Sequence, residues 1–306
     1  MSDSASQPGD PKRDTSRLGT PWTVLRLITW TTGYFTQAGL DEPRLSAEVL
    51  LAYVLGVPRL QLYVRFERVV EPPHLGAYRE LVKRVREGEP IAHLTGTREF
   101  YSLAFEVTPD VLIPRPETEL LVDVALEAAK AAAGGPLRLW DVCTGSGCVA
   151  VAAAKRAENL TVLATDISPP AVAVARRNVE RHKLGGRVRV EVADLLALPE
   201  SAGDLAPFDV ITANPPYVSE ATELPKVVRR EPPLALYAGP RGLEVIERLV
   251  RDAPARLRAG GRLATEMGMG QAAAVYDLLN HAGCWQDIRI LKDAAGIERV
   301  AVAVRT

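Results

Sequence analysis

The tetrapeptide Asn214-Pro-Pro-Tyr217 has the residue types needed to hold a planar NH2 group. Two consecutive prolines keep the backbone extended and donate no N–H, so the Pro215 carbonyl is free to accept a hydrogen bond. The side-chain oxygen of Asn214 offers a second acceptor, and Tyr217 offers an aromatic wall. We predict that Asn214, Pro215 and Tyr217 are catalytic and that all four residues, Pro216 included, bind the substrate. The alternative is a rigid loop that only ends a strand.

The segment Asp141-Val-Cys-Thr-Gly-Ser-Gly-Cys148 is a second candidate site, because it joins an apolar run to an alanine-rich helical stretch. Glycines in such a turn let a ligand approach the backbone, at the sheet edge where open α/β folds bind ligands. A dinucleotide-binding GxGxxG motif would need a glycine where the chain has Ala150, and a phosphate-binding P-loop would need a lysine that the turn lacks. Unless the turn merely closes a strand–helix unit, we predict cofactor contacts from Asp141, Cys143, Thr144, Gly145, Ser146 and Gly147.

Two carboxylates follow the next two apolar runs. Asp166 directly follows the run 161–165, where a carboxylate can accept hydrogen bonds from both ribose hydroxyls of an adenosine cofactor. The alternative for Asp166 is an N-cap of a helix that begins near Pro169. Asp194 follows the run 188–192 and is expected to reach the adenine amino group. Together with the glycine turn, these acids predict an adenosine-containing cofactor.

A nitrogen held beside an adenosine cofactor indicates methyl transfer from S-adenosylmethionine. Displacement of methyl from a sulfonium depends on alignment and desolvation, so we expect no metal site and no covalent nucleophile. Asn214 is expected to contact the cofactor as well as the target nitrogen. Because an amide lone pair is delocalised, polarisation by the two acceptors of the tetrapeptide should matter. The sequence reveals no obvious general base.

Helical stretches alternate with short apolar runs after residue 117, which predicts an α/β fold with parallel crossovers and a doubly wound sheet. We expect the S-adenosylmethionine-dependent methyltransferase domain to span residues 117–306. Its strand-like runs are 137–142, 161–165, 188–192, 208–213 and 261–265. Two later runs, 285–291 and 299–304, predict a final antiparallel hairpin at the sheet edge. Such a hairpin suits the Rossmann-like class I methyltransferase version of this fold.

The N-terminal third of the chain has a different pattern. Residues 1–20 are rich in Ser, Asp, Gly, Pro and Thr, which predicts a disordered tail. Helical spacing predicts a small helical domain at residues 21–90, which we interpret as a substrate-docking module. Residues 91–116 are expected to form a hairpin linker. This helical spacing is seen, for example, at Leu45, Val49, Ala52 and Tyr53.

Composition narrows the function classes. Hydrophobic residues make up 47% of the 306 residues, an ordinary share for globular domains with sizeable cores. The net charge of -1 provides no basic field for phosphates or anionic lipid. The longest apolar stretches fall short of the roughly 20 residues that span a bilayer. The N-terminus lacks the apolar core of a signal peptide. We therefore expect a cytoplasmic protein without membrane contact.

Together these motifs resemble those of the bacterial peptide-chain release factor glutamine methyltransferases, from about residue 21 to the C-terminus. The resemblance implies N5-methylation of a glutamine side chain in peptide chain release factors, with S-adenosylmethionine as the methyl donor. It rests on Arg44-Leu-Ser-Ala-Glu-Val-Leu-Leu51, Gly88-Glu-Pro90, Leu112-Ile-Pro-Arg-Pro-Glu-Thr-Glu119, Thr144-Gly-Ser-Gly147, Asn214-Pro-Pro-Tyr217 and Glu231-Pro232.

The resemblance also implies that the segment from Ile113 to Glu119 lies where the glutamine enters. Arg115, Glu117 and Glu119 are therefore expected to bind the substrate. The alternative for these three charged residues is a salt-bridged helix start.

Three positions depart from the family pattern. Cys143 stands at the usual first glycine of the turn, and His93 stands where a tyrosine is common. Arg241 replaces an acidic residue before Gly-Leu. At Cys143 we expect the cofactor to be contacted through the backbone and cofactor binding to be retained. We expect the departures at His93 and Arg241 to affect details of substrate binding more than the type of reaction.

Two other functions share parts of this pattern. An adenine-N6 or guanine-N2 methyltransferase could use the same tetrapeptide to hold the exocyclic amine of a flipped base. Such enzymes usually carry a basic surface, whereas residues 21–90 contain nine Lys and Arg against eight Asp and Glu. We therefore expect a protein partner and no direct contact with nucleic acid. A binding module without activity is disfavoured by the intact tetrapeptide and by both acids.

Overall fold

The computed structural model describes residues 21–306, which form two compact units that divide between Thr95 and Gly96. The disordered tail expected for residues 1–20 lies outside the described residues. Each unit has its own hydrophobic core and is described by itself. In the described part of the chain, no helix has both the length and the apolar character needed to cross a membrane.

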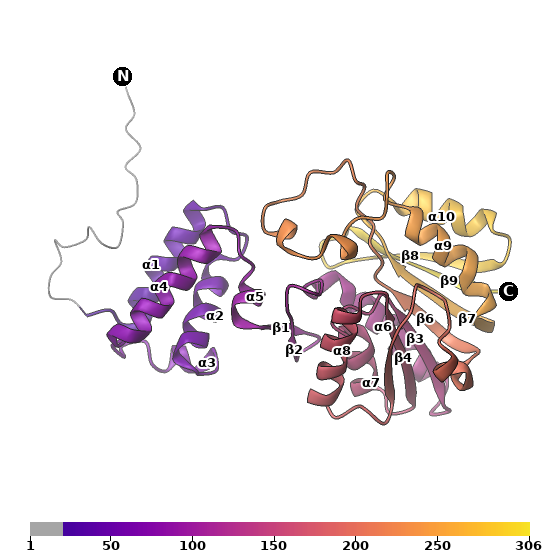
Figure 1. Ribbon diagram of the computed structural model, residues 1–306, viewed down its shortest axis with the longest axis horizontal. Coiled ribbons are helices and arrows are strands. Elements are labelled where there is room, and N and C mark those ends of the chain that lie inside the picture. The colour runs from indigo at the N-terminus through magenta and orange to yellow at the C-terminus, as the bar shows by residue number, and fades with distance from the viewer. Residues whose placement is uncertain (1–20) are drawn as a thin grey trace, which may run out of the picture. The chain divides into compact units, whose positions relative to one another are not determined.

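The first unit is helical (Figure 1). Proline at the first position begins α2 and α4, where its missing N–H costs no helical hydrogen bond. Gly56, with a φ of 63°, ends α2 in the left-handed conformation that glycine adopts without strain. The helices described in this unit are α1 Val24–Gln37, α2 Pro43–Leu55, α3 Leu60–Tyr63, α4 Pro72–Arg86 and α5 Ile91–Thr95.

The core of the helical unit is formed largely by α1, α2 and α4, with Phe35, Leu50, Leu51 and Tyr78 among its buried side chains. The helical pattern predicted around Leu45 is present as α2. Of the residues that indicated this helix, Ala52 is buried and Tyr53 is 53% exposed, and α2 also buries Ala47, Leu50 and Leu51. Apolar residues occur on nearly all sides of α2, so the local pattern alone could not select the buried face.

The second unit is built on a seven-stranded sheet with the strand order β5-β4-β3-β6-β7-β9-β8 (Figure 1). Strands β3 to β7 are parallel, and β9 pairs antiparallel with both β7 and β8. The predicted Rossmann-like sheet and its final antiparallel hairpin are therefore confirmed. The strands of this sheet are β3 Leu137–Val142, β4 Leu160–Asp166, β5 Val188–Val192, β6 Phe208–Ala213, β7 Leu257–Glu266, β8 Trp285–Lys292 and β9 Glu298–Arg305.

Helices cover both faces of this sheet, which gives three layers. Successive side chains of β3 point to opposite faces of the sheet, so Leu139 packs into the core on one face and Trp140 into the core on the other. One layer contains α6 Glu119–Ala131, α7 Cys148–Arg156 and α8 Pro169–Arg181. The opposite layer contains α9 Glu244–Asp252 and α10 Ala272–His281. An antiparallel pair, β1 Thr97–Phe100 and β2 Leu103–Glu106, packs Phe100 and Phe105 against the first layer.

Strand order places the candidate site. The chain builds β3, β4 and β5 toward one edge of the sheet and then returns to place β6 beside β3. Ligands of open α/β folds bind at such a reversal, outside the carboxyl ends of the strands. Val142 and Ala213 are partners in the β3–β6 register, so Cys143 and Asn214 leave the sheet side by side.

Candidate active site

A cavity of about 200 Å³ lies at the carboxyl ends of these strands. Nine of the residues predicted to act in the site line it: Asp141, Cys143, Thr144, Gly145, Ser146, Asp166, Asp194, Asn214 and Pro216. The other predicted residues, all within the described part of the chain, are outside this lining: Arg115, Glu117, Glu119, Gly147, Pro215 and Tyr217. Sequence reasoning missed Thr118 and Arg248, which also line the cavity.

The glycine turn is held mainly by its own N–H groups. Thr144 donates to the Thr165 carbonyl at 2.9 Å, Gly147 donates to the Thr144 carbonyl at 2.8 Å, and Gly145 donates to Asp166 Oδ2 at 2.9 Å. Three amides that could have faced a ligand are therefore bound within the protein. These three amides fix the shape of the turn beside the cavity.

Cys143 adopts a φ of 56°, in the left-handed region that favours glycine. This is the position at which the resemblance leads one to expect glycine, so the chain keeps the backbone conformation without the residue that adopts it easily. Burial raises the pKa of the Cys143 thiol well above its usual value, and the carboxylates of Asp166 and Asp141 add to this effect. The thiol is therefore kept neutral at the cavity wall.

Asp141, near the end of β3, holds the glycine turn in place through its carboxylate. Its carboxylate accepts hydrogen bonds from the Thr144 hydroxyl at 2.5 Å and from the Thr212 hydroxyl at 2.9 Å. It is 2% exposed, and burial raises its pKa to about 6. Asp141 therefore ties β3, the turn and β6 together.

Asp166 and Asp194, predicted to bind the ribose and the adenine of the cofactor, lie at the carboxyl ends of the successive strands β4 and β5. Asp166 Oδ1 accepts a hydrogen bond from the Ser168 N–H at 3.0 Å, and Asp166 Oδ2 accepts one from Gly145. Each carboxylate oxygen keeps a second acceptor site for a ligand. Burial raises the pKa of Asp166, while the backbone N–H groups of Ser168, Gly145 and Ile167 act in the opposite direction. Asp194 pairs with Arg248 at 2.8 Å, and Leu195 after it has a φ of 47°.

The Asn214 amide is held by a residue from a distant part of the chain. Its Nδ2 donates to the Thr118 hydroxyl at 3.1 Å, and that hydroxyl donates to Glu266 Oε2 at 2.7 Å. Among the described residues, no hydrogen bond reaches the Asn214 side-chain oxygen or the Pro215 carbonyl. Both acceptors assigned to the target NH2 group therefore remain available.

Glu266 is a buried acid that sequence reasoning missed. It ends β7, is fully buried, and also accepts a hydrogen bond from the Tyr217 hydroxyl at 3.2 Å. Burial raises its pKa to about 7, and the nearby charge of Glu117 adds to that increase. A signal was present, because Glu266 continues the series of polar residues at the carboxyl ends of the parallel strands.

A second buried acid, Glu231, holds the segment before η2 Pro116–Thr118. Its carboxylate accepts hydrogen bonds from the Ile113 N–H at 2.9 Å and from Arg115 Nη2 at 2.5 Å. Glu119 faces another way, because its carboxylate accepts the N–H of Tyr101 at 2.8 Å. Arg115 and Glu119 thus have partners within the protein, and their contact with a substrate stays a prediction.

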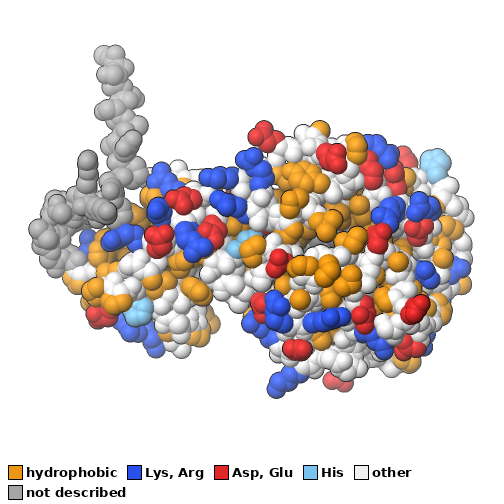
Figure 2. Space-filling model, viewed as in Figure 1, with side chains coloured by type: hydrophobic (Ala, Val, Ile, Leu, Met, Phe, Trp, Pro, Cys, Tyr) orange, Lys and Arg blue, Asp and Glu red, His pale blue; other side chains and the backbone are white. Residues whose placement is uncertain are grey.

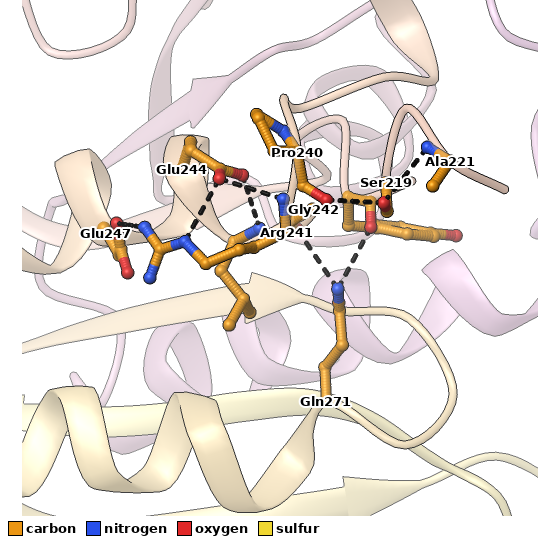
Figure 3. A network of polar contacts seen from close by, with 10 residues as sticks. Ser219, Ala221, Pro240, Arg241, Gly242, Glu244, Glu247 and Gln271 are labelled. Atoms are coloured by element: carbon orange, nitrogen blue, oxygen red, sulfur yellow. Dashed lines mark hydrogen bonds and ion pairs between the residues drawn. The ribbon is translucent and has the colours of Figure 1, made fainter.

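The backbone after the tetrapeptide is held by Gln271 (Figure 3). Its Nε2 donates to the Tyr217 carbonyl at 3.0 Å and to the Gly242 carbonyl at 3.1 Å. In the same network, Arg241 pairs with Glu244 and Glu247 and is exposed. The departure at position 241 is therefore accommodated by two acids of the following helix.

Comparison with known proteins agrees with this arrangement. The family model described as "PrmC N-terminal domain" matches residues 26–96, and a model described as "Methyltransferase domain" matches residues 140–230. A release factor glutamine methyltransferase of Rhodopirellula baltica is 44% identical, covering 92% of this chain and 96% of that protein. A protein of the same name from Geobacter sulfurreducens is 41% identical, covering 91% of this chain and 95% of that protein.

A solved structure shares the fold at low sequence identity. The hMettl16 catalytic domain in complex with MAT2A 3'UTR hairpin 6 aligns with a TM-score of 0.54 and 17% identity, covering 70% of this chain and 79% of that chain. The sheet, its order and the cavity at the reversal define a class I methyltransferase. Identity above 40% over nearly the whole length then sets the subgroup. The chain belongs to the release factor glutamine methyltransferase family.

Proposed function

We propose that this chain transfers the methyl group of S-adenosylmethionine to the side-chain amide nitrogen of a glutamine in a peptide chain release factor. The observation that carries the proposal is the pair of unused acceptors, the Asn214 amide oxygen and the Pro215 carbonyl, at the edge of a cavity lined by Asp166 and Asp194. The proposed reaction takes place in the cytoplasm, where release factors act.

The residues of the cavity fit the proposed cofactor. Asp166 keeps two acceptor sites for ribose hydroxyls, and Asp194 has a carboxylate for the adenine amino group. Apolar side chains of Val149 and Leu195 also line the cavity, as a flat base requires. S-adenosylmethionine supplies an electrophilic methyl group on a sulfonium centre. In this assignment the turn at Gly145 contacts the cofactor next to Asn214.

The tetrapeptide supplies alignment and polarisation. The Asn214 oxygen accepts one N–H of the glutamine amide and the Pro215 carbonyl accepts the other, which fixes the nitrogen in two directions. As positive charge develops on that nitrogen, both hydrogen bonds strengthen, so they stabilise the transition state more than the bound substrate. Tyr217 and Pro216 form the wall beside the planar amide. Removal of water from the buried surroundings favours transfer to the amide over transfer to solvent.

The partner in this proposal is a protein. Figure 2 shows hydrophobic side chains gathered in the middle of one face of the second unit, with acidic and basic side chains interspersed around them. A phosphate backbone would favour a continuous positive surface. The helical unit of residues 21–95 serves in this proposal to dock the release factor, and nucleic acid is no substrate.

The proposal is tested by incubating the protein with S-adenosylmethionine labelled in its methyl group. Purified release factor, RNA and DNA are offered in separate reactions. Label that appears in the release factor, and that tandem mass spectrometry locates on a glutamine side chain, supports the proposal. Label that enters RNA or DNA and not the release factor overturns it. The Asn214→Ala variant serves as the control for enzyme-dependent transfer.

A further inference from the structure

A continuous set of hydrogen bonds joins the end of β7 to the tetrapeptide. Glu266 accepts the Thr118 hydroxyl at 2.7 Å through Oε2 and the Tyr217 hydroxyl at 3.2 Å through Oε1. The Thr118 oxygen accepts Nδ2 of Asn214 at 3.1 Å. Thr118 and Glu266 are 2% and 0% exposed, so neither group can exchange its partner for water.

The number of hydrogens on each group determines which group donates and which accepts in these hydrogen bonds. A threonine hydroxyl has one hydrogen, and the carboxylate of Glu266 has none to donate, so Thr118 must donate to Glu266. Thr118 can then only accept from Asn214, which requires the NH2 group of Asn214 to face Thr118. The Asn214 oxygen is left to face away from Thr118. A rotated amide would place two acceptors against each other in a buried site.

We propose that Glu266 and Thr118 are positioning residues: through Thr118 the carboxylate fixes which way the Asn214 amide points, and through Tyr217 it fixes the aromatic wall. The inference rests on the proposed function, because it assigns the Asn214 oxygen to the target NH2 group. Glu266 touches neither substrate nor cofactor in this assignment.

The surroundings of Glu266 make its charge sensitive to pH. Burial raises its pKa to about 7, Glu117 also raises it, and the hydroxyls of Thr118 and Tyr217 and the charge of Arg299 act in the opposite direction. The ionised carboxylate accepts both hydroxyl hydrogens. A proton on Glu266 would turn one oxygen into a donor, and one of the two contacts would have to reverse. The aligned arrangement is therefore present above about pH 7 and is lost as pH falls.

Substitutions at Thr118 test the inference most directly. Thr118→Val keeps the shape of the side chain and removes the hydroxyl that accepts a hydrogen bond from the Asn214 NH2 group. The Asn214 amide is then free to rotate. We expect kcat to fall by about 10- to 100-fold, with KM for the release factor changed far less. Thr118→Ser restores the hydroxyl and should recover most of the lost kcat. Thr265→Val removes a buried hydroxyl from the adjacent position of β7, where side chains alternate between the two faces, and controls for general loss of stability.

Glu266→Gln tests the carboxylate itself. The glutamine side chain has an acceptor oxygen at one position and a donor NH2 group at the other, so it cannot accept hydrogen bonds from the Thr118 and Tyr217 hydroxyls in the way the carboxylate does. We expect kcat to fall by about 10-fold and the acidic limb of the pH–kcat profile to disappear. Equal kcat for Thr118→Val and wild type, with both proteins folded by circular dichroism, overturns the inference. An acidic limb that persists unchanged in Glu266→Gln also overturns it.

Amide resonances give a readout that does not depend on activity. In protein labelled with ¹⁵N-asparagine, the Asn214 NH2 signals, assigned by their loss in Asn214→Ala, should shift as Glu266 titrates and stop shifting in Thr118→Val. If the chemical shifts of the Asn214 NH2 group do not change with pH in the wild type, the inference is overturned even if the enzyme is active. Absence of glutamine methylation by wild type, with the titration intact, would count against the proposed function instead.

Discussion

A Cβ atom on Gly242 would lie 2.6 Å from the carbonyl oxygen of Tyr217 and 2.9 Å from the Ser219 nitrogen. The loop at Gly242 thus presses directly on the backbone that leaves the tetrapeptide, and its φ of 76° also favours glycine. The contact connects the start of α9 to the position of Tyr217, although the two segments are separate in the sequence.

Gly242→Ala is expected to lower kcat by at least about 10-fold and to destabilise the protein by roughly 1–3 kcal/mol, since backbone atoms must move. Gly260→Ala is the matched control. Gly260 has a φ of 72°, but a Cβ there meets nothing within 4 Å. Thermal unfolding and steady-state kinetics of both variants separate the clash from the backbone strain. If both variants keep wild-type kcat, Gly242 does not control the tetrapeptide.

Asp166→Ala should weaken S-adenosylmethionine binding by roughly 1.5–3 kcal/mol, the range for hydrogen bonds to a charged group. Asp166 also accepts the N–H of Gly145, so part of this loss comes from a looser turn. Calorimetry measures the affinity, and Asp204→Ala, which removes a mostly exposed carboxylate, controls for a change in net charge. An unchanged affinity in folded Asp166→Ala would remove the ribose assignment.

Asn214→Ala is expected to lower kcat by about 10²–10³-fold, the usual effect of losing one preorganised polar contact to the transition state. The dissociation constant for the cofactor should change by less than about fivefold, because Asp166 and the turn remain. Single-turnover methylation at saturating cofactor measures the effect. A near wild-type rate would reduce Asn214 to a loop residue.

Glu266 should make the protein less stable as pH rises from about 4.5 to about 7. Its pKa is raised from 4.5 to about 7 in the folded protein, so between these values the folded state binds more protons than the unfolded state. The free energy of unfolding therefore decreases with rising pH in this window, by up to about 1.4 kcal/mol per pH unit. Urea unfolding of wild type and Glu266→Gln across the window measures the difference. A wild-type stability that rises relative to the variant would contradict this sign.

A chain of residues 96–306 should bind S-adenosylmethionine nearly as well as the full protein and fail to methylate an intact release factor. The reason is that the residues we assign to the cofactor lie within the second unit, while docking is assigned to the first. Circular dichroism must first establish that the shortened chain folds. Retained methylation of the intact factor would show that the helical unit is not needed for docking.

The sequence by itself determined the sheet and much of the cavity. Each strand ending was marked by an apolar run followed by a polar or glycine residue, as at Gly145, Asp166, Asp194 and Asn214. Parallel strands bring such endings to one edge, so their convergence follows from local pattern alone. Membership of the family could likewise be inferred from contiguous motifs.

Only the tertiary structure decided which side chains hold these residues in place. Thr118, Asn214 and Glu266 are far apart in the sequence, and Glu231 reaches Ile113 and Arg115 across a similar distance. A buried polar group must find a partner, but the sequence does not say which one, because that choice depends on the packing of whole elements. The orientation of the Asn214 amide is therefore a property of the fold rather than of the tetrapeptide.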